Sequence, residues 1–192
     1  RDYKVTGVQT CALPILSHIN TTGVEQVTGF HMAGELLGMD AISTDQHNCN
    51  AVALEDSEVC EVPFNRLEEL FREIPSLQRH FHRMMSQEIT REQSLMLLLG
   101  NMKAEQRLAA FLLNLSGRYA RRGYSAKAFQ LRMTREEIGS YLGLTVESVS
   151  RLLTRFKKSG LIAVDHKSIS LDDTEGLRAL IATADASATC EH

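Results

Sequence analysis

The chain has 192 residues, of which 43% are hydrophobic and 23% charged, with a formal net charge of -3. That is enough apolar sequence for one or two small domains with cores. No apolar run approaches the length of a membrane span, and the 4 cysteines show no paired spacing. Composition therefore argues against a membrane protein and against a disulfide scaffold, and it predicts a protein of the reducing cytoplasm.

The net charge hides an asymmetry along the chain. Residues 102–160 contain 12 Lys and Arg residues against 4 Asp and Glu residues, out of totals of 21 and 24, so the remainder is acidic. A basic C-terminal block is typical of a module that binds phosphate groups. Basic helices also occur in proteins that never contact nucleic acid, so charge alone does not decide the function.

The first residues do not resemble a natural protein start. The chain begins with Arg1, and residues 5–15 read VTGVQTCALPI, which is similar to a common sequencing-library adapter translated in frame. We interpret residues 1–15 as an artefact, exclude them from fold reasoning, and expect them to be exposed or poorly packed. The alternative is a genuine divergent strand.

Residues 16–73 read as short strands separated by turns and followed by a short helix. Residues 51–54 and 59–64 are strand candidates, and Pro63 suits the end or the edge of a strand. We interpret this segment as the C-terminal part of an all-β domain. Alone, it is too short to close a barrel or a roll.

Residues 74–101 are predicted to form one long helix. Side chains at steps of three or four residues give it a coiled-coil-like seam, made of Phe81, Met85, Ile89, Glu92, Met96 and Leu99. The seam predicts a parallel homodimer, and packing against the chain's own domains is the alternative. Two facing Glu92 carboxylates would resist burial, so we hypothesise that they make the dimer marginal and switchable.

Residues 133–160 are the most informative segment. Thr134 is a predicted N-cap with Glu137 three residues later, Gly143 suits a helix C-terminus, and Thr145 caps the next helix. Two short helices joined by a tight turn, the second with small and basic side chains on its open face, are typical of a helix-turn-helix that binds in the DNA major groove. An ordinary helical hairpin is the alternative.

The segments around this hairpin complete a domain. A helix is predicted over residues 103–122, a β-hairpin wing over residues 161–164 and 168–171, and a closing helix over residues 175–184. We therefore interpret residues 102–192 as a winged helix-turn-helix DNA-binding domain.

Long strings from both halves of the chain match one protein family. They are EQVTGFHMAGELLGMDAI, ALEDSEVCEVPFNRLEEL, QEITREQSLMLLL, AEQRLAAFLLNLS and YLGLTVESVSRLLTRFKKSGLIAV. On these strings, which run nearly without gaps over residues 16–182, the chain resembles the oxygen-responsive fumarate and nitrate reduction branch of the CRP/FNR superfamily. The resemblance implies an α+β fold with a partial β-roll sensor domain (cupin-like, of the cyclic-nucleotide-binding type), a long dimerisation helix and a C-terminal winged helix-turn-helix.

The same resemblance implies a homodimeric activator of anaerobic, redox-responsive genes that binds a TTGAT-type palindrome and contacts RNA polymerase. In this branch the Glu, Ser and Arg of a V-E-x-x-S-R string read the half-site, and such side chains can bond to base edges. The predicted DNA-binding residues are Thr145, Val146, Glu147, Ser150, Arg151, Arg135 and Arg155. Glu147 could instead serve only as a partner of the helix dipole. No catalytic motif is present, so we predict no enzyme.

The resemblance also implies a 4Fe-4S cluster held by four cysteines. Cys60, in the string VCEVPF, is the single remaining ligand candidate, because the other three would lie before residue 16. One thiolate cannot hold such a cluster. We expect the intact protein to sense oxygen or nitric oxide through the cluster, and this chain to bind none.

Three alternatives stay open. A cyclic-nucleotide effector is disfavoured, because residues 47–50 read HNCN where that group carries an Arg followed by Ser or Thr. Haem is a weaker rival, for which the available ligands are His18, His31, His47, His80 and His82. The third is a dimerisation or scaffold fragment that no longer regulates.

Overall fold

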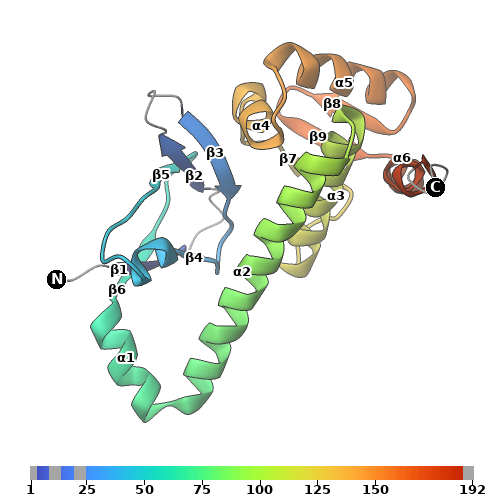
Figure 1. Ribbon diagram of the computed structural model, residues 1–192. Coiled ribbons are helices and arrows are strands. Elements are labelled where there is room, and N and C mark those ends of the chain that lie inside the picture. The colour runs from blue at the N-terminus through green and yellow to red at the C-terminus, as the bar shows by residue number, and fades with distance from the viewer. Residues whose placement is uncertain (1–3, 9–13, 20–24, 188–192) are drawn as a thin grey trace. The chain divides into compact units, whose positions relative to one another are not determined.

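The structure is a computed structural model that describes residues 4–8, 14–19 and 25–187. It divides into two compact units, residues 1–92 and residues 93–192 (Figure 1). The long helix α2 (Pro75–Asn101) runs through the boundary between them. Each unit is described by itself.

The first unit contains two small antiparallel sheets. One has the order β4-β1-β6 and the other the order β3-β2-β5. Their strands are β1 (Lys4–Val8), β2 (Pro14–Ile19), β3 (Glu25–Phe30), β4 (Leu36–Leu37), β5 (Asn50–Ala53) and β6 (Val59–Pro63), with a 3-10 turn η1 (Met39–Ile42) before β5. Buried apolar side chains from these elements and from the segment after β3 form the core: Ile15, Val27, Phe30, Met32, Leu37 and Ala41. The predicted β domain is thus present as paired short strands.

The N-terminal segment corrects one expectation. The backbone of Lys4–Val8 pairs with β4 on one side and with β6 on the other, and Ile15 on β2 is 4% exposed. The expectation that residues 1–15 are exposed or poorly packed is therefore wrong for these parts. The physical reason is that strand edges need backbone partners, which an extended segment supplies on both sides. Residues 9–13 lie outside the described part, and the artefact interpretation stays a prediction.

The helix α1 (Phe64–Glu73) and the first turns of α2 form a hairpin. Pro75 begins α2, where its missing N–H costs nothing. The ring of Phe81 on α2 lies 5.2 Å from that of Phe71 and 6.5 Å from that of Phe64. Because α1 of the same chain covers it, Phe81 is only 6% exposed. Phe81 therefore packs against its own chain, as the alternative to the seam predicts, and its place in a dimer seam stays a prediction.

Further along α2 an apolar stripe is open. Ile89 is 52% exposed, and Met96 and Leu97 are each 64% exposed. Glu92 is also exposed, whereas Met85 and Leu99 are half-buried. The single long helix is confirmed, and Leu97 joins the stripe although the heptad pattern omits it. We name the exposed side chains Ile89, Glu92, Met96 and Leu97 the α2 stripe.

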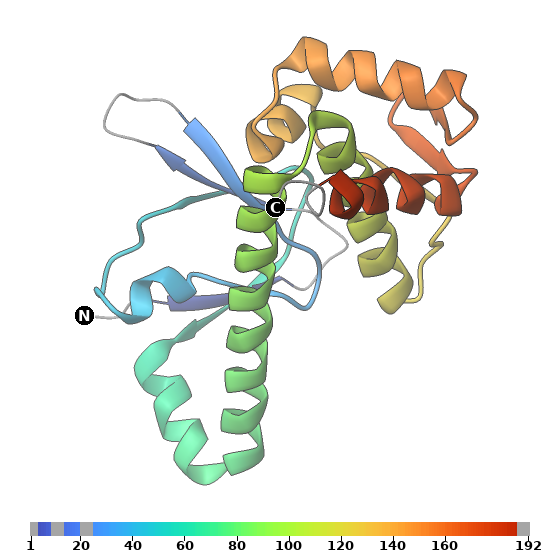
Figure 2. The same cartoon turned by 45° about the vertical axis from the view of Figure 1, so that its right-hand side comes forward.

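The second unit is a helical domain with one small sheet. Its elements are α3 (Ala104–Arg121), β7 (Ala128–Gln130), α4 (Arg135–Leu142), α5 (Val146–Lys158), β8 (Ile162–Asp165), β9 (Ser168–Leu171) and α6 (Thr174–Ser187). The antiparallel sheet has the order β7-β9-β8, and α6 lies beside α3 (Figure 2). The fully buried side chains include Leu108, Leu112, Leu115, Ile138, Phe156, Ile162, Ile169, Leu171 and Leu177.

The predicted winged helix-turn-helix is present, with α4 and α5 as the two helices and β8–β9 as the wing. Among the described residues, none of the helices combines the length and the apolar character needed to cross a membrane.

Candidate DNA-binding surface

Local hydrogen bonds define the start of α4. The Thr134 hydroxyl accepts the Glu137 backbone N–H at 3.1 Å, and the Glu137 carboxylate accepts the Thr134 backbone N–H at 2.6 Å. This reciprocal pair satisfies two N–H groups that the helix itself cannot. The predicted capping box is confirmed.

The turn between α4 and α5 depends on two glycines. Gly143 ends α4 with φ 62°, a left-handed conformation that favours glycine. A methyl group at Gly139 would lie 2.6 Å from the carbonyl oxygen of Leu144. That distance is shorter than van der Waals contact, so a larger residue would clash there. The two helices can therefore come close enough to form a compact hairpin.

The recognition helix α5 has one buried and one open face. The Thr145 hydroxyl caps it by accepting the Ser148 backbone N–H at 3.2 Å. Its apolar face packs into the domain through Val149, Leu152, Leu153 and Phe156. Because these four side chains fix the rotation of the helix, its polar and charged side chains lie on the half-buried and exposed sides.

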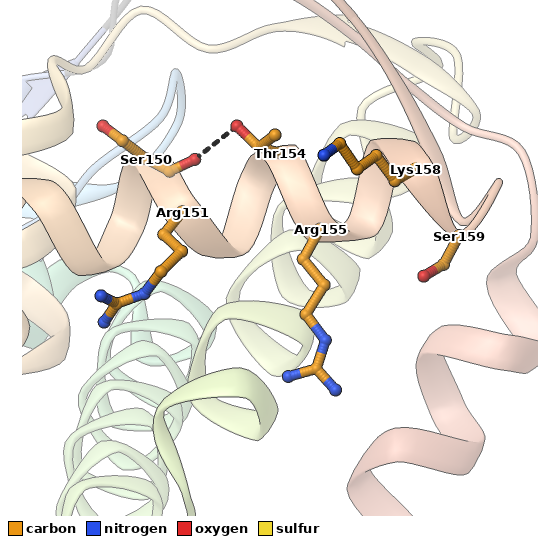
Figure 3. Close-up of a pocket in the computed structure, with 6 residues that line it drawn as sticks. All are labelled: Ser150, Arg151, Thr154, Arg155, Lys158 and Ser159. Atoms are coloured by element: carbon orange, nitrogen blue, oxygen red, sulfur yellow. Dashed lines mark hydrogen bonds between the residues drawn. The ribbon is translucent and has the colours of Figure 1, made fainter.

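A shallow open pocket of about 520 Å³ lies on the outward side of α5. The residues that line it are all of polar or cationic types: Ser150, Arg151, Thr154, Arg155, Lys158 and Ser159 (Figure 3). The guanidinium groups of Arg151 and Arg155 extend to the same side of the helix. The Thr154 hydroxyl donates to the backbone carbonyl of Ser150 at 2.9 Å. Such a surface can donate hydrogen bonds to phosphate oxygens and to base edges.

Most of the predicted DNA-binding residues lie on or next to this surface. Val146 is 41% exposed, and Thr145, Glu147 and Arg151 are exposed on the first two turns of α5. The backbone N–H of Glu147 and then the Thr145 hydroxyl hold the pKa of the Glu147 carboxyl below its usual value. The carboxylate is therefore anionic at neutral pH and can accept a hydrogen bond.

Two predicted residues stand apart from this group, one by its helix and one by its ion pair. Arg135 is exposed on the first turn of α4, not on α5. Arg155 lies on α5, but its Nη1 is 3.2 Å from Oε2 of Glu105 on α3. The two partners are 50 positions apart in the sequence, so no local pattern indicates this ion pair.

The sequence-based set omits Ser148. The Ser148 hydroxyl accepts the Thr145 hydroxyl at 3.1 Å and Nη2 of Arg151 at 3.4 Å. Ser148 therefore connects the capping residue Thr145 with Arg151. The signal in the sequence is the three-residue spacing of these positions, which places them on one side of a helix.

The wing is attached to the recognition helix. Lys157 Nζ of α5 donates to the backbone carbonyl of Val164 on β8 at 3.2 Å. At the tip of the hairpin His166 adopts φ 54°, which closes the two-residue turn between the strands.

Comparisons with known proteins agree with this geometry. Residues 15–73 match the model of the cyclic nucleotide-binding domain, and residues 106–180 match that of the Crp-like helix-turn-helix domain. The chain is 51% identical over 162 residues to the transcriptional regulatory protein btr of Bordetella pertussis, a match that covers 84% of this chain and 67% of that protein. The chain belongs to the CRP/FNR family of transcription regulators.

Two further proteins are similar to this chain. The chain is 52% identical over 162 residues to the fumarate and nitrate reduction regulatory protein of Salmonella typhimurium, covering 84% of this chain and 65% of that protein. The solved structure of FixK2 from Bradyrhizobium japonicum superposes with a TM-score of 0.83 at 30% identity, over 94% of this chain and 88% of that one. The chain spans about two thirds of the length of the Bordetella and Salmonella proteins. Membership of a family of DNA-binding regulators confirms that it is not an enzyme.

The cysteines of this CRP/FNR chain do not form a cluster site within the described residues. In that part of the chain no group of three His, Cys, Asp or Glu side chains is placed to hold a metal ion. Cys60 is exposed on β6. The Cys49 thiol donates to the Asp40 carboxylate at 3.4 Å, and burial together with that negative charge raises its pKa to about 11. Cys49 is therefore a protonated thiol, and Cys11 and Cys190 lie outside the described residues.

Proposed function

We propose that this chain binds a two-fold symmetric DNA site as a homodimer, with α5 of each protomer in a major groove. The observation that carries the proposal is the division of α5 into a buried apolar face and an outward face of hydroxyl and guanidinium groups. This is the arrangement that a recognition helix needs, since its position is fixed from behind while its donors reach the bases.

We assign the readout to the first two turns of α5. Arg151 is suited to bond bidentately to guanine, Glu147 to accept from a cytosine amino group, and Val146 to contact a thymine methyl. Ser150 adds a short donor beside them. Thr145, Arg135 and Arg155 surround this group and are assigned to phosphates, which position the domain without reading sequence.

The α2 stripe is the proposed dimer contact. Three large apolar side chains, Ile89, Met96 and Leu97, are more than half exposed on this helix. A second copy of α2 would bury them symmetrically. Because two recognition helices bound to one duplex lie about one helical turn apart, the dimer also predicts a palindromic target. The family resemblance implies that its half-sites are of the TTGAT type.

The names of the relatives support a role in anaerobic gene control. They include the fumarate and nitrate reduction regulatory proteins and the anaerobic regulatory protein of Haemophilus influenzae, which is 52% identical over 165 residues. By the same analogy we propose RNA polymerase as a partner, contacted near residues 28–40. Control by a 4Fe-4S cluster would need thiolates beyond Cys60, which the described residues do not supply.

Fluorescence anisotropy tests the proposal. The chain, prepared without air, is titrated into a labelled TTGAT-type palindrome and into a scrambled duplex of equal length. Tight binding to the palindrome alone is expected. Equal, weak and strongly salt-dependent binding to both duplexes would contradict sequence-specific recognition.

A further inference from the structure

A charged network joins α2 to the β domain within the first unit. Arg91 of α2 donates from Nη1 to Oε2 of Glu35 at 3.2 Å and from Nη2 to Oε1 of Glu88 at 2.6 Å. Glu88 lies one turn earlier on the same helix, whereas Glu35 lies just before β4. Arg91 therefore connects two elements whose residues are 56 positions apart in the sequence.

The network is partly shielded from water. The side chains of Glu35, Arg91 and Glu88 are 21%, 22% and 24% exposed. Oε2 of Glu35 also accepts the backbone N–H of Met32 at 3.1 Å, so a second donor holds the same carboxylate oxygen. Charge-assisted hydrogen bonds in such a setting are stronger and better oriented than those between fully exposed side chains.

Packing around the guanidinium supports a defined geometry. His31, which is 2% exposed, places its Nε2 3.3 Å from Nη2 of Arg91. A methyl group at Gly29 would lie 2.9 Å from that Nε2 and 3.5 Å from the same Nη2. The absence of a side chain at Gly29 therefore leaves the space in which His31 and Arg91 meet.

Arg91 lies on the side of α2 away from the α2 stripe. It is two residues from Ile89, which corresponds to a rotation of about 200° around the helix. One side of α2 thus contacts the β domain through Arg91, while the other presents exposed apolar side chains.

We propose that Arg91 is a positioning residue that latches α2 to the β domain through Glu35 and so sets how the α2 stripe is presented to a second protomer. The latch consists of the chain's own side chains, so it holds α2 without a bound ligand. The part of the inference that concerns the second protomer rests on the proposed dimer.

The test is a double-mutant cycle on the full chain with Arg91→Gln, Glu35→Gln and the double variant. Hydrogen–deuterium exchange of the α2 amides over residues 84–92 reports the latch, and sedimentation equilibrium reports the monomer–dimer constant. Arg91→Gln should speed exchange about tenfold and weaken the dimer by a similar factor, Glu35→Gln should do both to a smaller extent, and the double variant should be no worse than Arg91→Gln. Arg91→Lys should give exchange rates and dimer constants between those of wild type and Arg91→Gln, because lysine keeps the positive charge but lacks the planar guanidinium that bonds two partners at once.

Arg83→Gln, which removes an exposed arginine of the same helix, is the matched control and should change neither quantity. Unchanged exchange in Arg91→Gln, or additive effects in the double variant, would overturn the latch. If amide exchange speeds up in Arg91→Gln but the monomer–dimer constant is unchanged, the latch would exist without affecting how the α2 stripe meets a second protomer. A wild-type chain that stays monomeric would refute the proposed dimer instead, and exchange would still decide whether the latch exists.

Discussion

Arg155 of the recognition helix forms an ion pair with Glu105 of α3, with 3.2 Å between Nη1 and Oε2. The Arg155 side chain is 64% exposed and that of Glu105 is 25% exposed. An ion pair this open to water contributes at most about 1 kcal/mol. Arg155 is therefore held only weakly. In the proposed DNA complex, Glu105 would compete with a DNA phosphate for it.

Glu105→Gln should raise the affinity for DNA. Removing the competing carboxylate also removes a negative charge near the phosphates, so binding should strengthen by about two- to fivefold on specific and scrambled duplexes alike. Anisotropy titrations at several salt concentrations measure this change. Glu175→Gln on α6 removes the same charge elsewhere and serves as control. A loss of affinity would show instead that Glu105 orients Arg155 for binding.

Arg151→Ala should loosen sequence preference. Loss of a bidentate contact to guanine costs about 1–3 kcal/mol on the palindrome and little on a scrambled duplex. Lys158→Ala, at the far end of the same surface, should weaken both complexes equally and lower the salt slope by about 1. Competition titrations against base-substituted half-sites separate the two behaviours. If Arg151→Ala also weakens all duplexes uniformly, Arg151 is a phosphate contact.

Local sequence patterns predict the helix-turn-helix well because its determinants are local. The hydroxyl of Thr134 and the carboxylate of Glu137 are three residues apart, and Thr145 and Ser148 repeat the spacing. Each pair satisfies backbone groups within one helical turn, so it acts regardless of the rest of the fold. The left-handed Gly143 likewise ends α4 through its own conformation.

The contacts that the sequence does not predict join distant segments. Phe81 fits the heptad seam by its spacing, but only the folded hairpin shows that Phe71 of α1 covers it. Arg155 reads as a solvent-facing cation until Glu105 is brought beside it. Helical periodicity tells which side of a helix a residue occupies, but it does not tell what lies against that side.

Glu92→Ala should strengthen the proposed dimer. Glu92 lies in the α2 stripe and is exposed, so a symmetric partner would bring two carboxylates together. Relieving their repulsion is worth about 1 kcal/mol in water-like surroundings, or about fivefold in the dissociation constant. Sedimentation equilibrium measures this constant, and Glu73→Ala on α1 is the control for loss of one negative charge. An unchanged constant would mean that Glu92 does not lie at the interface.

Two glycine substitutions should change stability in opposite directions. Gly139→Ala places a methyl group 2.6 Å from the Leu144 carbonyl oxygen, and such overpacking costs about 1–3 kcal/mol. Gly117→Ala on α3 meets no atom within 4 Å, so the higher helix propensity of alanine should stabilise by about 0.5–1 kcal/mol. Urea denaturation followed by circular dichroism compares them. Equal effects would refute the tight α4–α5 turn.

The most direct test of a dimer that reads DNA with two recognition helices is a change in half-site spacing. Anisotropy titrations compare the TTGAT-type palindrome with a duplex in which about five extra base pairs, roughly half a helical turn, separate the half-sites. The account predicts that the insertion reduces affinity to that for a single half-site, because the second half-site then faces the opposite side of the duplex. Equal affinity for both duplexes would contradict binding as a two-fold symmetric dimer.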